Sequence, residues 1–140
     1  MRAKCIIIIC SILICMAIGG CAPDKEKIEK VNDLDYTVLA EADWPETLKE
    51  LIEERKMKPF NLNYSEGEFM YICVGYGEQQ SGGYSIQVDD FYEGEEVLYI
   101  NTTLLGPSEQ EQSQEQAQDN KSYPVIVLKT EYLDKTVVFE

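Results

Sequence analysis

The sequence predicts a mainly β or α+β domain: a small antiparallel structure of about five to six strands, sandwich- or barrel-like, with one packed α-helix. Short apolar runs at residues 69–74, 97–100 and 125–128 have the length and composition of buried strands. Residues 84–89 alternate apolar and polar side chains, as in a strand with one face in water. One stretch, at about 45–57, instead has the spacing of an amphipathic helix.

Further strands are expected near both ends of this region. Residues 36–40 (YTVLA) are rich in β-forming side chains and predict a first strand. The run at 97–100 is apolar on both faces, which indicates a central strand. Residues 136–139 (TVVF) follow a turn at 133–135 and predict the last strand.

The helix has recognisable start and stop signals. Asp43 is expected to be the N-cap, with Pro45 near the first helical position and Glu46 in the capping-box place. The apolar stripe consists of Leu48, Leu51 and Ile52, and Pro59 ends the helix. Trp44, the single tryptophan, is expected to fix the start of the helix to the sheet.

The N-terminus is organised as an export signal. Arg2 and Lys4 precede an apolar run at residues 5–18, which is shorter than the ~20 residues of a spanning helix. The run ends in Ile18-Gly19-Gly20-Cys21, which resembles the lipobox of bacterial lipoprotein precursors. That resemblance implies cleavage before Cys21 and transfer of a diacylglyceryl group to its thiol. The alternatives are an uncleaved signal anchor and an ordinary secretory signal that is cut elsewhere.

We therefore expect three regions. Residues 1–20 are a lipoprotein signal peptide, residues 21–35 a polar tether, and residues 36–140 the β-rich domain. The chain is then anchored by lipid on Cys21 to the extracytoplasmic face of the cell membrane. Inside the domain, residues 107–121 contain a single apolar residue, Ala117, and predict a disordered loop.

Composition excludes several classes of function. All 26 acidic residues but only 10 of the 12 basic ones follow position 20, so the mature chain has a formal charge of −16 and is not expected to bind nucleic acid. The absence of histidine excludes Ser-His-Asp and Cys-His catalysis and histidine zinc sites. With Cys21 committed to lipid, only Cys73 remains, and its apolar surroundings predict a buried, unreactive thiol.

Residues 75–88 (GYGEQQSGGYSIQV) resemble the signature of the PrcB-like C-terminal domain. Gly106-Pro107 and residues 122–128 (SYPVIVL) match its later landmarks, and the resemblance covers about residues 68–130. The family's namesake is a lipoprotein component of a surface protease complex that supports the protease rather than cutting peptides. The resemblance implies a non-catalytic, membrane-anchored accessory or protein-interaction module with a protein partner, which could be a protease.

The candidate partner-binding residues lie in and around the glycine-rich segment. They are Tyr76, Ser81, Gly82, Gly83, Tyr84 and Tyr123. Adjacent glycines permit positive φ, and tyrosine is enriched in binding hot spots. The structural alternative is a tight turn with Tyr84 packed on the face of Ile86 and Val88, and core packing for the other two tyrosines.

Two other classes of function are a protease inhibitor and an enzyme. The Gly-Gly-Tyr turn faintly resembles a loop of chagasin-like cysteine-protease inhibitors, which gives a protease inhibitor as the alternative function. An enzyme is not expected, because the acidic pairs Asp89-Asp90 and Glu95-Glu96 are consecutive and have the character of solvated turn residues. No catalytic residue, metal site or cofactor is predicted, since the acids lack the spacing of a calcium loop.

Overall fold

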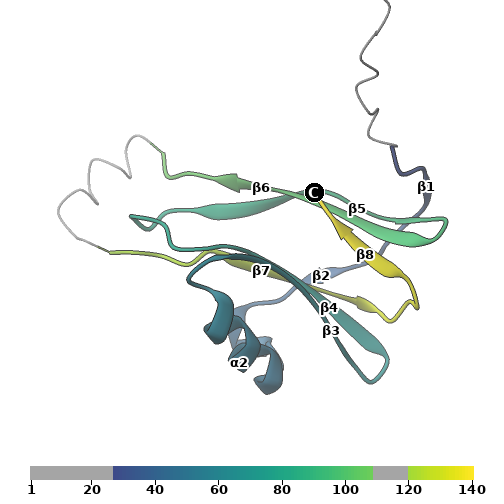
Figure 1. The fold of residues 1–140 in the computed structure, drawn as a ribbon, viewed down its shortest axis with the longest axis horizontal. Helices are drawn as coiled ribbons and strands as arrows, with labels where there is room; N and C mark the ends of the chain where they lie inside the picture. Colours follow the sequence, from purple (N-terminus) through teal and green to yellow (C-terminus); the bar gives the residue numbers. More distant parts are fainter. Residues whose placement is uncertain (1–26, 109–119) are drawn as a thin grey trace, which may run out of the picture.

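The chain folds into two four-stranded β-sheets packed face to face, with a helix on the outer surface of one of them (Figure 1). The computed structural model describes residues 27–108 and 120–140. The predicted signal peptide, Cys21 and residues 109–119 of the predicted loop at 107–121 lie outside the described residues. Within the described ranges, no helix is long and apolar enough to cross a membrane.

The strands divide equally between the two sheets. Sheet A has the order β1 (Lys30–Asp33), β5 (Ser85–Gly94), β6 (Val97–Leu105) and β8 (Thr136–Phe139). Sheet B has the order β2 (Thr37–Val38), β7 (Val125–Glu131), β4 (Phe69–Tyr76) and β3 (Pro59–Glu66). The predicted class, a small antiparallel β domain with one helix, is confirmed, and the two sheets form an open sandwich rather than a closed barrel.

One strand pair departs from the antiparallel pattern. Strand β8 runs parallel to β6, whereas all other named strand pairs of the described chain are antiparallel. The chain leaves sheet A after β6, reverses through β7 in sheet B and reverses again on its return. Two reversals restore the original direction, so β8 aligns with β6.

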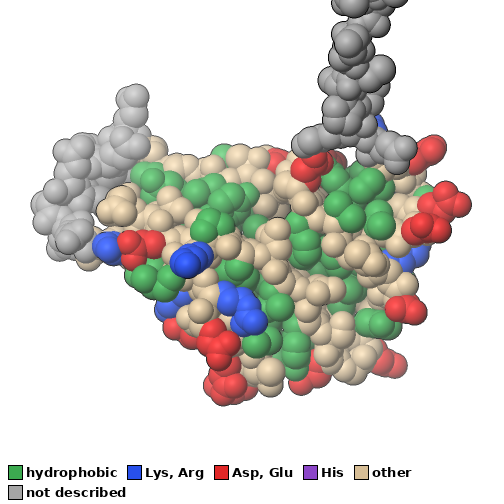
Figure 2. All heavy atoms as spheres, in the orientation of Figure 1, with side chains coloured by type: hydrophobic (Ala, Val, Ile, Leu, Met, Phe, Trp, Pro, Cys, Tyr) green, Lys and Arg blue, Asp and Glu red, His purple; other side chains and the backbone are tan. Residues whose placement is uncertain are grey.

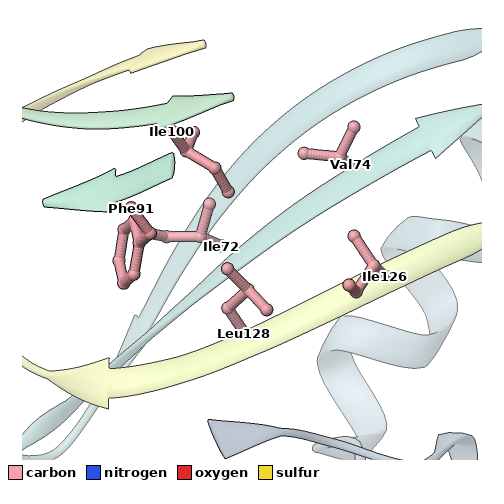
Figure 3. Packing of buried hydrophobic residues seen from close by; sticks show 6 residues of the cluster. All are labelled: Ile72, Val74, Phe91, Ile100, Ile126 and Leu128. Atoms are coloured by element: carbon pink, nitrogen blue, oxygen red, sulfur yellow. The ribbon is translucent and has the colours of Figure 1, made fainter. Parts of the chain in front are cut away.

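The core consists of two layers on either side of sheet B. Between the sheets, four side chains of β4 and β7 meet Phe91 and Ile100 of sheet A (Figure 3). These four are Ile72, Val74, Ile126 and Leu128. The intervening residues Tyr71, Cys73 and Val127 point the other way, toward Leu48 and Ile52 of the helix. Both faces of β4 and β7 are therefore buried, which explains their continuous apolar runs.

Helix α2 (Glu46–Arg55) confirms the helix predicted at 45–57. Trp44 packs in the helix-side core layer and donates a hydrogen bond from Nε1 to the Leu39 carbonyl oxygen at 3.2 Å, as expected of a residue that fixes the helix start. The predicted N-cap was wrong: Asp43 ends the 3₁₀ turn η1 (Glu41–Asp43), and Pro45 occupies the cap without a side-chain hydrogen bond.

Three strands also differ from the sequence prediction. Lys30–Asp33, which the sequence assigns to the tether, forms β1 against β5, and the strand predicted at 36–40 is reduced to Thr37–Val38. Every residue of β1 is exposed. The strand therefore has no buried face that would show as alternating apolar residues in the sequence. Strand β3 was not predicted, although Phe60, Leu62 and Tyr64 alternate there with polar residues. Residues 27–108 and 120–140 therefore contain eight strands, compared with the expected five or six.

Cys73 is confirmed as a buried thiol. It has no exposed surface and lies in the helix-side core layer. Burial raises the pKa of the Cys73 thiol to about 12, so the thiolate does not form at neutral pH.

The packing of β6 predicts a sharp contrast between two leucines. Leu98 has no exposed surface and Leu105 is 42% exposed. Leu98→Ala is expected to lower the free energy of unfolding by about 2–5 kcal/mol, because it removes buried contacts and leaves a cavity. The matched Leu105→Ala should change it by less than about 0.5 kcal/mol. Urea unfolding followed by Trp44 fluorescence measures both, and equal losses would contradict this account of the core.

Candidate partner-binding site

Strands β4 and β6 end, and strands β5 and β7 begin, at the same end of the sandwich (Figure 1). The connection at residues 77–84 carries the chain from sheet B to sheet A, and the connection at residues 106–124 returns it. We call residues 77–84 and 120–124 together the rim. Figure 2 shows basic and acidic side chains grouped beside each other at this end of the molecule.

The two parts of the rim are joined by backbone hydrogen bonds. Gln79 and Ser122 form an antiparallel bridge, in which the Gln79 amide donates to the Ser122 carbonyl at 2.8 Å and the Ser122 amide returns the bond at 3.1 Å. The Ser122 hydroxyl donates to the Ser81 carbonyl oxygen at 2.6 Å. The Tyr76 amide donates to the Pro124 carbonyl oxygen at 3.1 Å. The rim is therefore a short, irregular extension of sheet B.

Glu78 is the polar centre of the rim. Its carboxylate accepts a bond from Lys121 Nζ at 2.8 Å through Oε1 and from the Tyr123 hydroxyl at 3.2 Å through Oε2. The hydrogen bond from Lys121 is the main cause that lowers the pKa of Glu78 below its ordinary value. Lys56 Nζ, at the end of α2, lies 5.3 Å from the centroid of the Tyr123 ring, so the helix also contacts the rim.

Two glycines give the first rim segment its path. Gly77 has φ +74°, and a Cβ there would lie 2.9 Å from Pro59 Cδ and from the Pro59 nitrogen. Gly83 has φ +78°, which confirms that the glycine pair includes a residue in the left-handed region. A larger residue at Gly77 would collide with backbone, whereas at Gly83 it would meet conformational strain.

The three candidate tyrosines occupy different environments. The Tyr76 hydroxyl is 2.8 Å from both the carbonyl oxygen and Oγ1 of Thr102 in β6, so it links the two sheets. Tyr84 is half-buried directly before β5, in which Ile86 and Val88 pack against the core between the sheets. Tyr123 is half-buried and bonded to Glu78. Tyr76 is therefore a structural residue, whereas Tyr84 and Tyr123 lie on the rim.

The structure brings all six candidates from the sequence to this end of the domain. All of them except Tyr76 belong to the rim itself, where Gly83 and Gln80 are the exposed residues of the first segment. The sequence did not single out Glu78, Lys121 or Ser122, although they hold the rim together. Their roles depend on contacts between residues about 43 positions apart, and no local pattern reports such contacts.

The acidic pairs have no catalytic arrangement. Asp89 lies in a strand, as predicted for residues 84–89, and Asp90 continues it: both are exposed within β5, at a bulge that follows Val88, rather than in a turn. The Asp89 carboxylate accepts bonds from Thr103 Oγ1 at 2.5 Å and Gln87 Nε2 at 2.6 Å. Glu95 and Glu96 are exposed between β5 and β6, as predicted. Among the described residues, no group of three metal-ligating side chains is close enough to hold an ion.

Comparison with known proteins relates part of the chain to a protein family. Residues 70–131 match the family model described as PrcB C-terminal. The matched region runs from β4 to β7 and includes both connections that form the rim. No curated protein and no solved structure matches the chain.

The inter-sheet bond of Tyr76 can be tested separately from binding. Tyr76→Phe keeps the ring but removes the hydroxyl from Thr102, and we expect the free energy of unfolding to fall by about 1 kcal/mol. Tyr132→Phe is the control, because Tyr132 is 49% exposed. Urea denaturation measures both changes. A Tyr76→Phe protein as stable as wild type would show that this bond does not hold the sheets together.

The Glu78 cluster predicts a pH-dependent rim. A carboxyl whose pKa is lowered on folding stabilises the folded form above its unfolded pKa, and this contribution is lost as pH falls through the lowered value. Hydrogen exchange at the Gln79 and Ser122 amides, corrected for intrinsic rates, should therefore accelerate below about pH 4. Glu78→Gln should abolish the pH dependence, whereas Glu68→Gln, at the other end of β4, should retain it. An unchanged profile in Glu78→Gln would exclude this role.

Proposed function

Because the chain contains a PrcB C-terminal-like domain, we propose that it is a non-catalytic accessory protein that binds a protease complex through the rim. The family is named for a protease-associated subunit, which supports a protein partner of this class. We also propose that a lipid on Cys21 anchors the chain to the extracytoplasmic face of the membrane.

The joining of two inter-sheet loops into one surface is the observation that carries this proposal. Loops on a rigid scaffold are common binding elements, and those that are fixed before binding lose less conformational entropy in a complex. Here the Gln79–Ser122 bridge and the Glu78–Lys121 pair restrain both segments. The exposed part of the rim offers backbone groups, Gln80 and half-buried Tyr123, which suits protein contact.

The chemistry of the rim supports binding over catalysis. The Ser122 hydroxyl donates to a backbone carbonyl and has no general base as its partner in that bond. The Glu78 carboxylate is occupied by Lys121 and Tyr123 and has a lowered pKa, which disfavours work as a general acid or base near neutral pH.

The sequence features at positions 2–21 support the anchor. From Cys21 to Lys27, the first described residue, six peptide units span at most about 20 Å. A lipid on Cys21 would therefore hold the domain near the membrane. Labelling with an alkyne fatty acid should mark the wild-type chain and not Cys21→Ser, and equal labelling of both would defeat the anchor.

A photo-crosslinking residue tests the rim without removing an interaction. Placed at Gln80, it should capture a protein that reacts with an active-site-directed protease probe. The same residue at exposed Glu68, at the other end of β4, should not. Capture at both positions, or at Gln80 of proteins that the probe does not label, would contradict the proposal.

An activity assay with the captured protease distinguishes an accessory protein from an inhibitor, the alternative function. Adding the chain to that protease should maintain or raise its rate of peptide hydrolysis and slow its loss of activity on incubation. A progressive fall in rate with added chain would instead favour inhibition of the chagasin-like type.

A further inference from the structure

Each sheet has two edge strands, which leave backbone N–H and C=O groups without a strand partner. Proteins protect such edges by short strands, irregular pairing or charged side chains. Here β2 has two residues, β8 has four, and β1 has four with an irregular register and charged ends at Lys30 and Asp33. Three of the four edges therefore carry a recognisable protection.

The fourth edge, β3, is neither short nor irregular, and its one charged residue, Glu66, stands at its end. It has eight residues and pairs with β4 without interruption from Pro59 opposite Tyr76 to Glu66 opposite Phe69. Its proline is confined to the first position, and residues 60–65 are uncharged. In the described ranges, no strand pairs with the outer side of β3. This long and regular edge is open to another β-strand.

The side chains of β3 match a strand of the same kind. Phe60, Leu62 and Tyr64 are half-buried and pack in the core layer on the α2 side of sheet B. Asn61, Asn63 and Ser65 are exposed on the opposite side. A strand with the same alternation would extend the apolar stripe on one face and pair amides on the other.

The sequence of β3 is complementary to itself. Antiparallel pairing about a two-fold axis at Leu62 places Lys58 of one copy opposite Glu66 of the other, and both residues are exposed. The same register sets Phe60 opposite Tyr64 and Leu62 opposite Leu62. In this register, even-numbered residues lie opposite even-numbered ones and odd-numbered residues opposite odd-numbered ones. Antiparallel pairing requires this, because the backbone groups that point outward belong to every second residue.

We propose that two copies of the chain pair through β3, so that two B sheets join into one continuous antiparallel sheet. The occupant of the edge is thus a second copy, related by a two-fold axis. The pairing satisfies the outward backbone groups of both β3 strands and twice sets a lysine opposite a glutamate.

The acidic charge of the chain does not oppose this contact locally. Lys58 and Glu66 are the charged residues at the ends of the paired region, so the contact itself is neutral. Repulsion between more distant acidic groups is screened beyond about 8 Å at physiological ionic strength.

Charge reversal tests the pairing and its register. The full chain, solubilised in detergent, should have the mass of a dimer by sedimentation equilibrium. Lys58→Glu and Glu66→Lys each set like charges opposite one another and should each weaken the dimer about tenfold. The double variant restores opposite charges and should recover the wild-type dimer. Circular dichroism confirms that each variant is folded.

A second measurement fixes the register. Copies carrying Asn61→Cys and copies carrying Asn63→Cys, distinguished by tags, should form a mixed disulfide on mild oxidation in the membrane, because residues 61 and 63 are opposed. A Gln87→Cys copy on β5 should not react with either. A monomeric wild-type chain would overturn the proposal and leave the edge to an extended segment of another protein. A dimer that is indifferent to charge reversal would overturn it as well.

Discussion

Burial of β4 and β7 on both faces is the constraint from which the rest of the domain follows. The two strands pair directly, with Ile72 opposite Leu128 and Cys73 opposite Val127. The first of these pairs faces sheet A and the second faces α2. A slip of one residue would exchange the two faces for every side chain, so the register is fixed by two core layers at once. The paired ends of β4 and β7 then bring Tyr76 beside Pro124, where the rim begins.

The rim therefore takes its position from the core. Because β4 and β7 are neighbours and antiparallel, the chain leaving β4 and the chain entering β7 must be adjacent. The Gln79–Ser122 bridge continues this pairing for one more step, and Glu78 binds Lys121 and Tyr123 across it. The family match at residues 70–131 covers this unit, the pair of strands and both connections.

The sequence predicted the elements whose signals are local. Apolar runs identified β4, β6 and β7, the spacing of Leu48 and Ile52 identified α2, and the resemblance located the glycine-rich segment. The β-forming run at 36–40 indicated β2 but not its two-residue length, and exposed β1 carries no apolar alternation, because only pairing with a neighbouring strand defines it. The parallel β8 follows from the path between sheets, which periodicity does not report. For the same reason Glu78 and Ser122 were missed, since each acts on a residue far along the chain.

Charge is balanced locally at both proposed interaction surfaces. The chain has a large acidic excess, yet at the rim Glu78 is matched by Lys121, and β3 begins directly after Lys58 and ends at Glu66. A surface ion pair such as Glu78–Lys121 adds little to stability, so its main effect is to cancel local charge. Elsewhere on the described surface some acidic groups are also paired, as in Glu53–Lys56 and Glu93–Lys135, and the net acidic excess disfavours nonspecific association. The rim lies at one end of sheet B and adjoins the start of β3, where the Glu78 amide donates to the Met57 carbonyl oxygen at 3.4 Å, so a partner on the rim would lie close to the Lys58 end of the proposed β3 contact.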